Sequence, residues 1–133
     1  MILVADTSAI VAILFDEPER ARFKRLLLEH DVKISAGTLI EILRVVQLGL
    51  GPEASAAVDT LLETSAAEVV PVDADQVAEA RRGMLLFGRG RGEEPAVLNL
   101  GDLFAYALAR RLGLPLLFKG DGFARTDVQP VVA

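Results

Sequence analysis

Short apolar runs alternate with amphipathic helical segments along the whole chain, and this order constrains the fold more than any other feature. The runs that fit strands are ILVA (2–5), VKIS (32–35), EVVPV (68–72), LPLLF (114–118) and DVQPVV (127–132), whose proline suits a sheet edge. Strands that alternate with helices predict a mainly parallel sheet with helices on both faces, a three-layer α/β/α sandwich. With 133 residues, we expect one domain over 1–133.

Polar caps and Gly or Pro stops mark the expected helices. Thr7 or Ser8 can cap the first helix, and Thr38 begins another that ends at GLGP (49–52). The other expected helices cover 19–30, 52–65, the segment after Asp73 and 100–112, and the one long loop covers 87–97.

Acidic residues stand where strands end and where helices begin. Asp6 follows ILVA, and Asp121 comes just after PLLFK. In open parallel sheets, ligands bind beyond the carboxyl ends of the strands, so both acids project toward the same crevice. Glu41 and Asp102 each lie in the first turn of an expected helix, whose amino end faces that crevice. We therefore expect these four carboxylates to gather at one edge of the sheet.

Each of these acids also has a purely structural alternative. The alternatives are a capping box between Thr38 and Glu41, a helix start at Asn99 and Asp102, a glycine-flanked turn at Asp121 and a cap for the first helix at Asp6. Convergence favours chemistry, because four neighbouring carboxylates raise one another's pKa unless a cation neutralises them.

The residue inventory limits which cation that is. The chain has no Cys and a single His, His30, so thiolate and histidine-rich sites are excluded. A site made of carboxylates favours a hard ion, Mg²⁺ or Mn²⁺. No apolar stretch approaches the roughly 20 residues of a membrane span, and no basic segment precedes the first apolar run, so we expect a cytoplasmic protein without a membrane partner. The net charge of −5 argues only against RNA binding across the whole surface.

Four motifs resemble those of a known family. They are LVADTSAI (3–10), TLIE (38–41), NLGD (99–102) followed by FAYALA, and LLFKGDGFARTD (116–127). Together they resemble the acidic motifs of PIN-domain ribonucleases, and most closely those of the VapC-type toxins of bacterial type II toxin–antitoxin systems. The resemblance runs from Ile2 to about Val132 and includes the FGRGRG loop ahead of NLGD. It implies a PIN-like fold and a metal-dependent endoribonuclease.

The resemblance also implies roles for individual residues. Asp6, Glu41, Asp102 and Asp121 would be catalytic, with Asp6, Asp102 and Asp121 as ligands of Mg²⁺ or Mn²⁺. Ser8 and Asn99 would support them. Asp127 matches an acid often found in this subgroup, whereas Lys119 departs from the Thr or Ser that many PIN domains have two residues before the last acid. The basic residues expected to contact RNA are Arg89, Arg91, Lys119 and Arg125, with Arg44 as a further candidate.

The same resemblance implies partners. The substrate would be RNA, and a VapB-like antitoxin would place a basic side chain in the acidic site and a tail in an apolar groove beside it. A homodimer is implied as well, and the mean hydropathy of +0.40 is in keeping with it.

Two other classes stay open on the sequence. A phosphatase of the haloacid dehalogenase type has an Asp after its first strand and a late GD motif, as at Gly120 and Asp121, but it needs a second Asp where this chain has Ser8. A receiver-like signalling module has an acidic Mg²⁺ pocket and a late lysine such as Lys119. It also carries adjacent acids after its first strand, which VADTS does not supply.

Overall fold

A four-stranded parallel sheet forms the centre of the molecule. The computed structural model describes residues 1–88 and 98–132, and within them the strands are ordered β3-β2-β1-β4. The strands are β1 (Ile2–Ala5), β2 (Asp31–Ser35), β3 (Glu68–Val70) and β4 (Leu116–Leu117). Because β2 and β3 lie on one side of β1 and β4 on the other, the strand order reverses between β1 and β4, which is where such sheets open a crevice.

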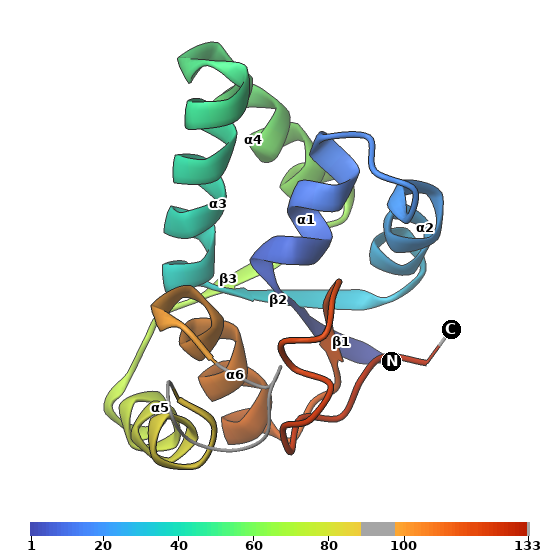
Figure 1. The fold of residues 1–133 in the computed structure, drawn as a ribbon. Helices are drawn as coiled ribbons and strands as arrows, with labels where there is room; N and C mark the ends of the chain where they lie inside the picture. The colour runs from blue at the N-terminus through green and yellow to red at the C-terminus, as the bar shows by residue number, and fades with distance from the viewer. Residues whose placement is uncertain (89–97, 133) are drawn as a thin grey trace.

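Helices cover both faces of this sheet, as predicted (Figure 1). One layer holds α1 (Thr7–Leu14), α2 (Arg20–Glu29), α3 (Ala36–Leu50) and α4 (Ser55–Thr64), and the other holds α5 (Ala74–Phe87) and α6 (Leu100–Leu112). A short 3₁₀ helix, Pro52–Ala54, leads into α4. None of the helices in the described ranges is long and apolar enough to cross a membrane.

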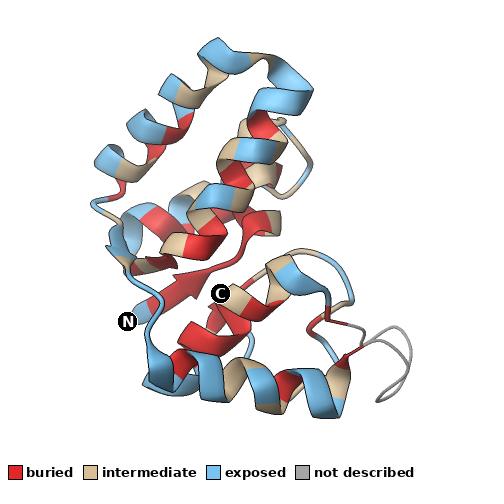
Figure 2. Cartoon of the chain, turned by 90° about the vertical axis from the view of Figure 1, so that its left-hand side faces the viewer, coloured by how far each residue is buried: buried red, intermediate tan, exposed pale blue. Residues whose placement is uncertain are grey.

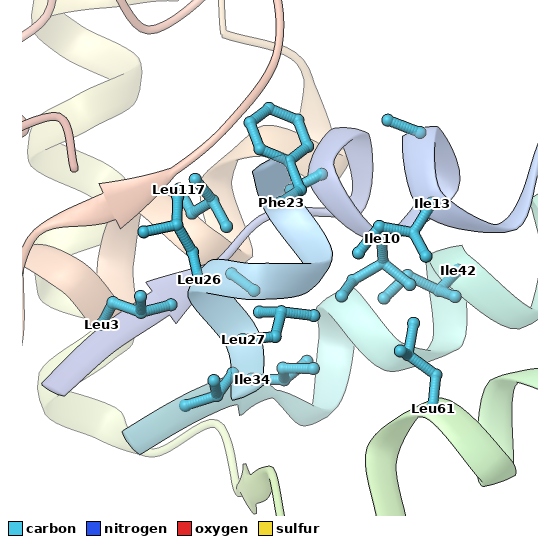
Figure 3. Packing of buried hydrophobic residues seen from close by; sticks show 14 of the residues in the cluster. Leu3, Ile10, Ile13, Phe23, Leu26, Leu27, Ile34, Ile42, Leu61 and Leu117 are labelled. Carbon is cyan, nitrogen blue, oxygen red and sulfur yellow. The ribbon is translucent and has the colours of Figure 1, made fainter. Parts of the chain in front are cut away.

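Each layer has its own apolar core. Side chains alternate across a strand, so Leu3 and Ala5 of β1 enter the core under α1–α4, whereas Val4 enters the core under α5 and α6. Figure 3 shows the first core, where side chains of all four helices meet the sheet. Figure 2 shows the buried residues as bands along the helix sides that face inward. The carboxyl ends of the strands are therefore held between two rigid layers.

Two helix starts differ from the prediction. Helix α3 begins at Ala36, because the side chain of Ser35 accepts a hydrogen bond from the Gly37 N–H (3.2 Å) and caps it. Thr38 is consequently inside the helix and buried, so the alternative of a capping box between Thr38 and Glu41 is wrong. Helix α1 is capped by Asp6 rather than by Thr7 or Ser8.

The last predicted strand, 127–132, does not form a strand in the structure. Leu116 forms only an isolated parallel bridge with Pro130. The Leu116 N–H donates to the Gln129 carbonyl (2.8 Å), and the Val131 N–H donates to the Leu116 carbonyl (3.1 Å). Both hydrogen bonds use the residues that flank Pro130, so the missing proline N–H is tolerated at this edge of the sheet.

Asp127 fastens this last segment to α5 and α6. The buried Tyr106 hydroxyl donates to Asp127 (2.8 Å), and Arg82 forms an ion pair with the same carboxylate. Burial raises the pKa of Asp127, but the hydrogen bonds from Arg82 and Tyr106 outweigh it, so the net pKa is lowered. Arg110 donates to the Asp127 carbonyl (3.1 Å). These contacts give Asp127 a structural role.

Candidate active site

Asp6 lies at the point where the strand order reverses. It directly follows β1, and its Oδ2 caps α1 by accepting hydrogen bonds from the Ser8 N–H (3.0 Å) and the Ser8 hydroxyl (2.7 Å). The residue is only 3% exposed. Its other oxygen, Oδ1, is buried and has no hydrogen-bond partner among the described atoms. The capping alternative is therefore correct for one oxygen, and it leaves the second oxygen available to a ligand.

The environment of Asp6 favours its protonated form. Burial first, and then the charges of Asp102 and Glu41, raise its pKa to about 6 against the opposing hydrogen bonds from Ser8. The pKa of Asp102 is also raised, first by burial and then by the charge of Glu41, against the hydrogen bond from Asn99. Asp6, Glu41 and Asp102 thus act on one another electrostatically, as the sequence predicted for these three acids.

Glu41 reaches from α3 toward the first turns of α1 and α6. Its Oε1 accepts a hydrogen bond from the Thr7 hydroxyl (2.5 Å). A methyl group at Gly101 would overlap the Glu41 carboxylate, so the absence of a side chain at Gly101 makes room for it. Sequence reasoning did not single out Thr7 or Gly101 for the site. The one available signal was their place beside acids, in DTS and in NLGD.

Asp102 and Asn99 form the capping box that was one of the alternatives. The Asp102 N–H donates to Asn99 Oδ1, and the Asn99 N–H donates to Asp102 Oδ2, both at 3.0 Å. This box fixes the Asp102 carboxylate at the amino end of α6, where the charge of Glu41 acts on it and from where its own charge acts on Asp6. Asn99 supports Asp102 in the way that Ser8 supports Asp6.

Asp121 stands apart from the other three acids in this structure. It is exposed, and its carbonyl accepts from the Ala124 N–H (3.1 Å) in a turn. It is not among the charges that raise the pKa of Asp6 or of Asp102. One contact links its segment to the site, because the Lys119 N–H donates to the Ser8 hydroxyl (2.9 Å).

The expected RNA-binding residues lie in different places. Arg89 and Arg91 fall outside the described residues. Arg125 is exposed after β4, and the ammonium group of Lys119 lies 2.8 Å from Glu17 Oε1. Arg44 lies on the surface of α3 and lines a hollow of about 390 Å³ together with Glu41.

The donor set suits a hard divalent cation, although the carboxylates have not closed around one position. In the described parts of the chain, no three Asp, Glu or His side chains are close enough to enclose one ion. Two of the carboxylates have other partners: Thr7 of α1 donates to Glu41, and Asn99 at the start of α6 donates its N–H to Asp102. The unpartnered, buried Oδ1 of Asp6 and the mutual repulsion of the acids fit a cation that they would share.

Comparison with known proteins assigns the family. A family model described as the PIN domain matches residues 3–129. The chain belongs to the PIN-domain family. This assignment excludes the phosphatase and receiver alternatives. The PIN domain is 43% identical to Ribonuclease VapC42 of Mycobacterium tuberculosis over 96% of this chain and 98% of that one. It is 39% identical to Ribonuclease VapC30 of the same species, over 97% and 98%.

Solved structures of similar proteins share the fold. The crystal structure of Mycobacterium tuberculosis VapC20, a sarcin–ricin loop cleaving toxin, matches this PIN domain with a TM-score of 0.77 at 18% identity, over 97% of this chain and 98% of that one. FitAcB of Neisseria gonorrhoeae matches with a TM-score of 0.69 at 27% identity, over 99% and 97%. Both matches confirm the predicted three-layer architecture.

Proposed function

We propose that this PIN domain is a Mg²⁺- or Mn²⁺-dependent endoribonuclease and the toxin of a toxin–antitoxin pair. Relatives that are 39–43% identical over nearly the whole chain are named VapC ribonucleases. The observation that carries the chemistry is Asp6, which is buried at the carboxyl end of β1 with one unpartnered oxygen and is electrostatically coupled to Glu41 and Asp102. Such a group at the point where the strand order reverses is typical of a catalytic centre.

The proposed roles follow from the contacts of each acid. Asp6, Asp102 and Asp121 would hold the cation, which when bound supplies positive charge against the negative charge that builds on the scissile phosphate. Ser8 orients the Asp6 carboxylate, and the capping box orients the Asp102 carboxylate. Glu41 is held by Thr7 on one oxygen and orients the attacking water with the other.

The direct test is the metal dependence of RNA cleavage. The purified protein is expected to cut single-stranded RNA in Mg²⁺ or Mn²⁺, to stop when EDTA removes the metal and to recover when Mn²⁺ is restored in excess. Gel analysis of labelled RNA measures the cleavage, with a second purification by a different affinity tag to exclude contaminating nucleases. Cleavage that persists at full rate in EDTA would contradict the proposal.

RNA must approach an acidic edge of the sheet, so basic side chains nearby are needed to attract its phosphates. Among the described residues, Arg44 forms no ion pair or hydrogen bond, and it shares its hollow with Glu41 and Asn99. An unpaired guanidinium beside the site is suited to a phosphate of the substrate. We place Arg44 in the RNA path with Arg89, Arg91 and Arg125.

The Arg44→Ala variant tests this placement. Its KM for RNA is expected to rise several-fold with little change in kcat, and the salt dependence of binding should fall by about one phosphate contact. Titration of KM against NaCl measures both effects. The matched control is Arg25→Ala, which removes a cation that pairs with Glu29 on α2. Equal effects in the two variants would assign the change to overall charge instead.

An antitoxin partner is part of the proposal. Structures that resemble this one include VapBC complexes from Rickettsia felis and Salmonella typhimurium, both bound to DNA. This chain has an apolar groove of about 230 Å³ between α5 and α6, with Val77, Met84 and Leu103 in its walls. Such a groove suits the apolar tail of an antitoxin. A VapB-like antitoxin would also bring a basic side chain to Asp6.

A homodimer is proposed on the exposed apolar side chains. Ile40 and Leu48 of α3 and Leu100 of α6 are 69, 74 and 72% exposed. Large apolar side chains gathered on the surface of a small domain are typical of an interface.

A further inference from the structure

Lys119 joins three parts of the molecule. It lies two residues after β4 and two residues before Asp121. Its backbone N–H donates to the Ser8 hydroxyl at 2.9 Å. Its ammonium group lies 2.8 Å from Glu17 Oε1 and 3.2 Å from Glu19 Oε1. One residue therefore contacts both Ser8, in the first turn of α1, and the connection between α1 and α2.

The two glutamates are held in place by the local backbone. The Glu17 N–H donates to the Ala12 carbonyl (2.9 Å), which folds the connection back onto α1. Glu19 is the N-cap residue of α2 and is fixed by the start of that helix. Their side chains are 34 and 32% exposed, and they meet at one ammonium group that is 34% exposed. Without this ammonium group the two carboxylates would repel each other, so the positive charge of Lys119 stabilises their approach.

The backbone contact of Lys119 bears on Asp6 through Ser8. The Ser8 hydroxyl accepts from the Lys119 N–H and donates its single proton to Asp6 Oδ2 at 2.7 Å. The accepted hydrogen bond fixes the direction in which this proton points. It therefore helps to keep Oδ2 occupied and Oδ1 free of hydrogen bonds.

The same contacts anchor the segment that carries Asp121. Gly120, with a φ of +94°, is the only residue between Lys119 and Asp121. An anchor at Lys119 consequently limits where the Asp121 carboxylate can go. The side chain of Lys119 does this by tying the segment after β4 to Glu17 and Glu19 in the connection between α1 and α2.

We propose that Lys119 is a positioning residue. We call the ion-pair cluster of Lys119, Glu17 and Glu19 the Lys119 clasp. The clasp holds the segment after β4 against the first turn of α1, so that Ser8 stays on Asp6 and the place of the Asp121 segment relative to Asp6 is fixed. The inference rests on the proposed function, because that function is what assigns a bound cation to these acids. It gives Lys119 a role other than the RNA contact expected from sequence, because its charge is already shared by two carboxylates.

The test measures cation binding directly. Mn²⁺ binding, followed by electron paramagnetic resonance, is expected to weaken by roughly 10- to 100-fold in Lys119→Met, as it does when groups that orient metal ligands are removed. The Mg²⁺ concentration for half-maximal RNA cleavage should rise by the same factor, with KM for RNA unchanged at saturating metal. Lys119→Arg keeps the charge and should bind Mn²⁺ within about threefold of the wild type.

Two further variants make the result decisive. Lys33→Met removes a comparable ion pair, 2.9 Å to Glu68, between β2 and β3, and should leave Mn²⁺ binding unchanged. The Glu17→Gln/Glu19→Gln variant keeps Lys119 and should weaken Mn²⁺ binding in the same direction as Lys119→Met. It carries the test if Lys119→Met does not fold, as judged by circular dichroism.

The outcomes separate the clasp from the proposed function. A Lys119→Met protein that binds Mn²⁺ normally but has a raised KM for RNA would overturn the clasp and favour an RNA contact. Equal loss of Mn²⁺ binding in Lys33→Met would also overturn it, because a general loss of stability would then explain the effect. A wild-type protein that binds Mn²⁺ in a Lys119-dependent manner but cuts no RNA would support the clasp and refute the ribonuclease.

Discussion

The Asp6→Asn variant should lose at least about 10³-fold of its RNA cleavage and yet unfold at a higher denaturant concentration than the wild type when no metal is present. Loss of cleavage follows because the amide is neutral and puts an N–H₂ group where a cation needs an oxygen. The buried Oδ1 is the oxygen through which this change acts most directly, since it has no hydrogen-bond partner among the described residues and is available to a cation.

The gain in stability follows from the sign of the pKa change. The pKa of Asp6 is raised from 3.8 to about 6, so the folded protein binds the Asp6 proton more tightly than the unfolded chain does. The stability that this proton provides is complete below about pH 4 and is lost as the pH rises through 6. Above that range, the ionised carboxylate costs the wild type about 3 kcal/mol. A buried amide N–H₂ without a partner offsets part of this, which leaves a net gain of about 1–2 kcal/mol.

Urea denaturation of both proteins at pH 5 and pH 8, in EDTA, measures the effect. The difference between variant and wild type should be larger at pH 8. Asp59→Asn on the exposed side of α4 is the matched control and should change neither stability nor cleavage appreciably. Addition of Mn²⁺ should stabilise the wild type and not Asp6→Asn, because only the wild type binds it well. A variant that is less stable than the wild type at pH 8 would refute the raised pKa, and a fully active variant would refute the site.

The sequence was sufficient for the four strands of the sheet, though it added a fifth over 127–132, and for the position of Asp6. A short apolar run such as ILVA, followed directly by helix-start residues, fits a buried strand, and a residue at the end of such a strand lies at the edge of the sheet. The position of Asp102 at the amino end of α6 was predictable in the same way, because Asn99 and Asp102 form a recognisable helix-start pattern. These predictions needed only local signals and the general topology of parallel sheets.

The rest depended on contacts between distant segments. The start of α3 was predicted two residues late, because Ser35 serves both as the last strand residue and as the cap, and the sequence pattern suggests only the strand. With that start misplaced, Glu41 was assigned a possible partner within its own helix, whereas its partner is Thr7 of α1. The contact of Lys119 with Glu17 joins residues that are 102 positions apart, and no sequence period indicates it.

Gly101→Ala should lower kcat by roughly 100-fold even though it replaces glycine by the best helix former. On helix propensity alone, this substitution in the first turn of α6 should stabilise the protein by up to about 1 kcal/mol. The methyl group, however, would occupy the place of the Glu41 carboxylate. Glu41 must then leave its hydrogen bond with Thr7, and its carboxylate leaves the place from which it acts on Asp6 and Asp102.

A double-mutant cycle with Glu41→Ala distinguishes this displacement from a general disturbance of α6. In the Glu41→Ala background the space beside residue 101 is empty, so the added methyl group should cost no further activity and should raise the midpoint of urea denaturation. Single-turnover cleavage at saturating Mg²⁺, measured on the four proteins, gives the coupling. If Gly101→Ala cost the same factor with and without the Glu41 carboxylate, the glycine would act on Asp102 or on the RNA directly. If the cost disappears in the Glu41→Ala background, the glycine at residue 101 acts on cleavage through the space that it leaves for the Glu41 carboxylate.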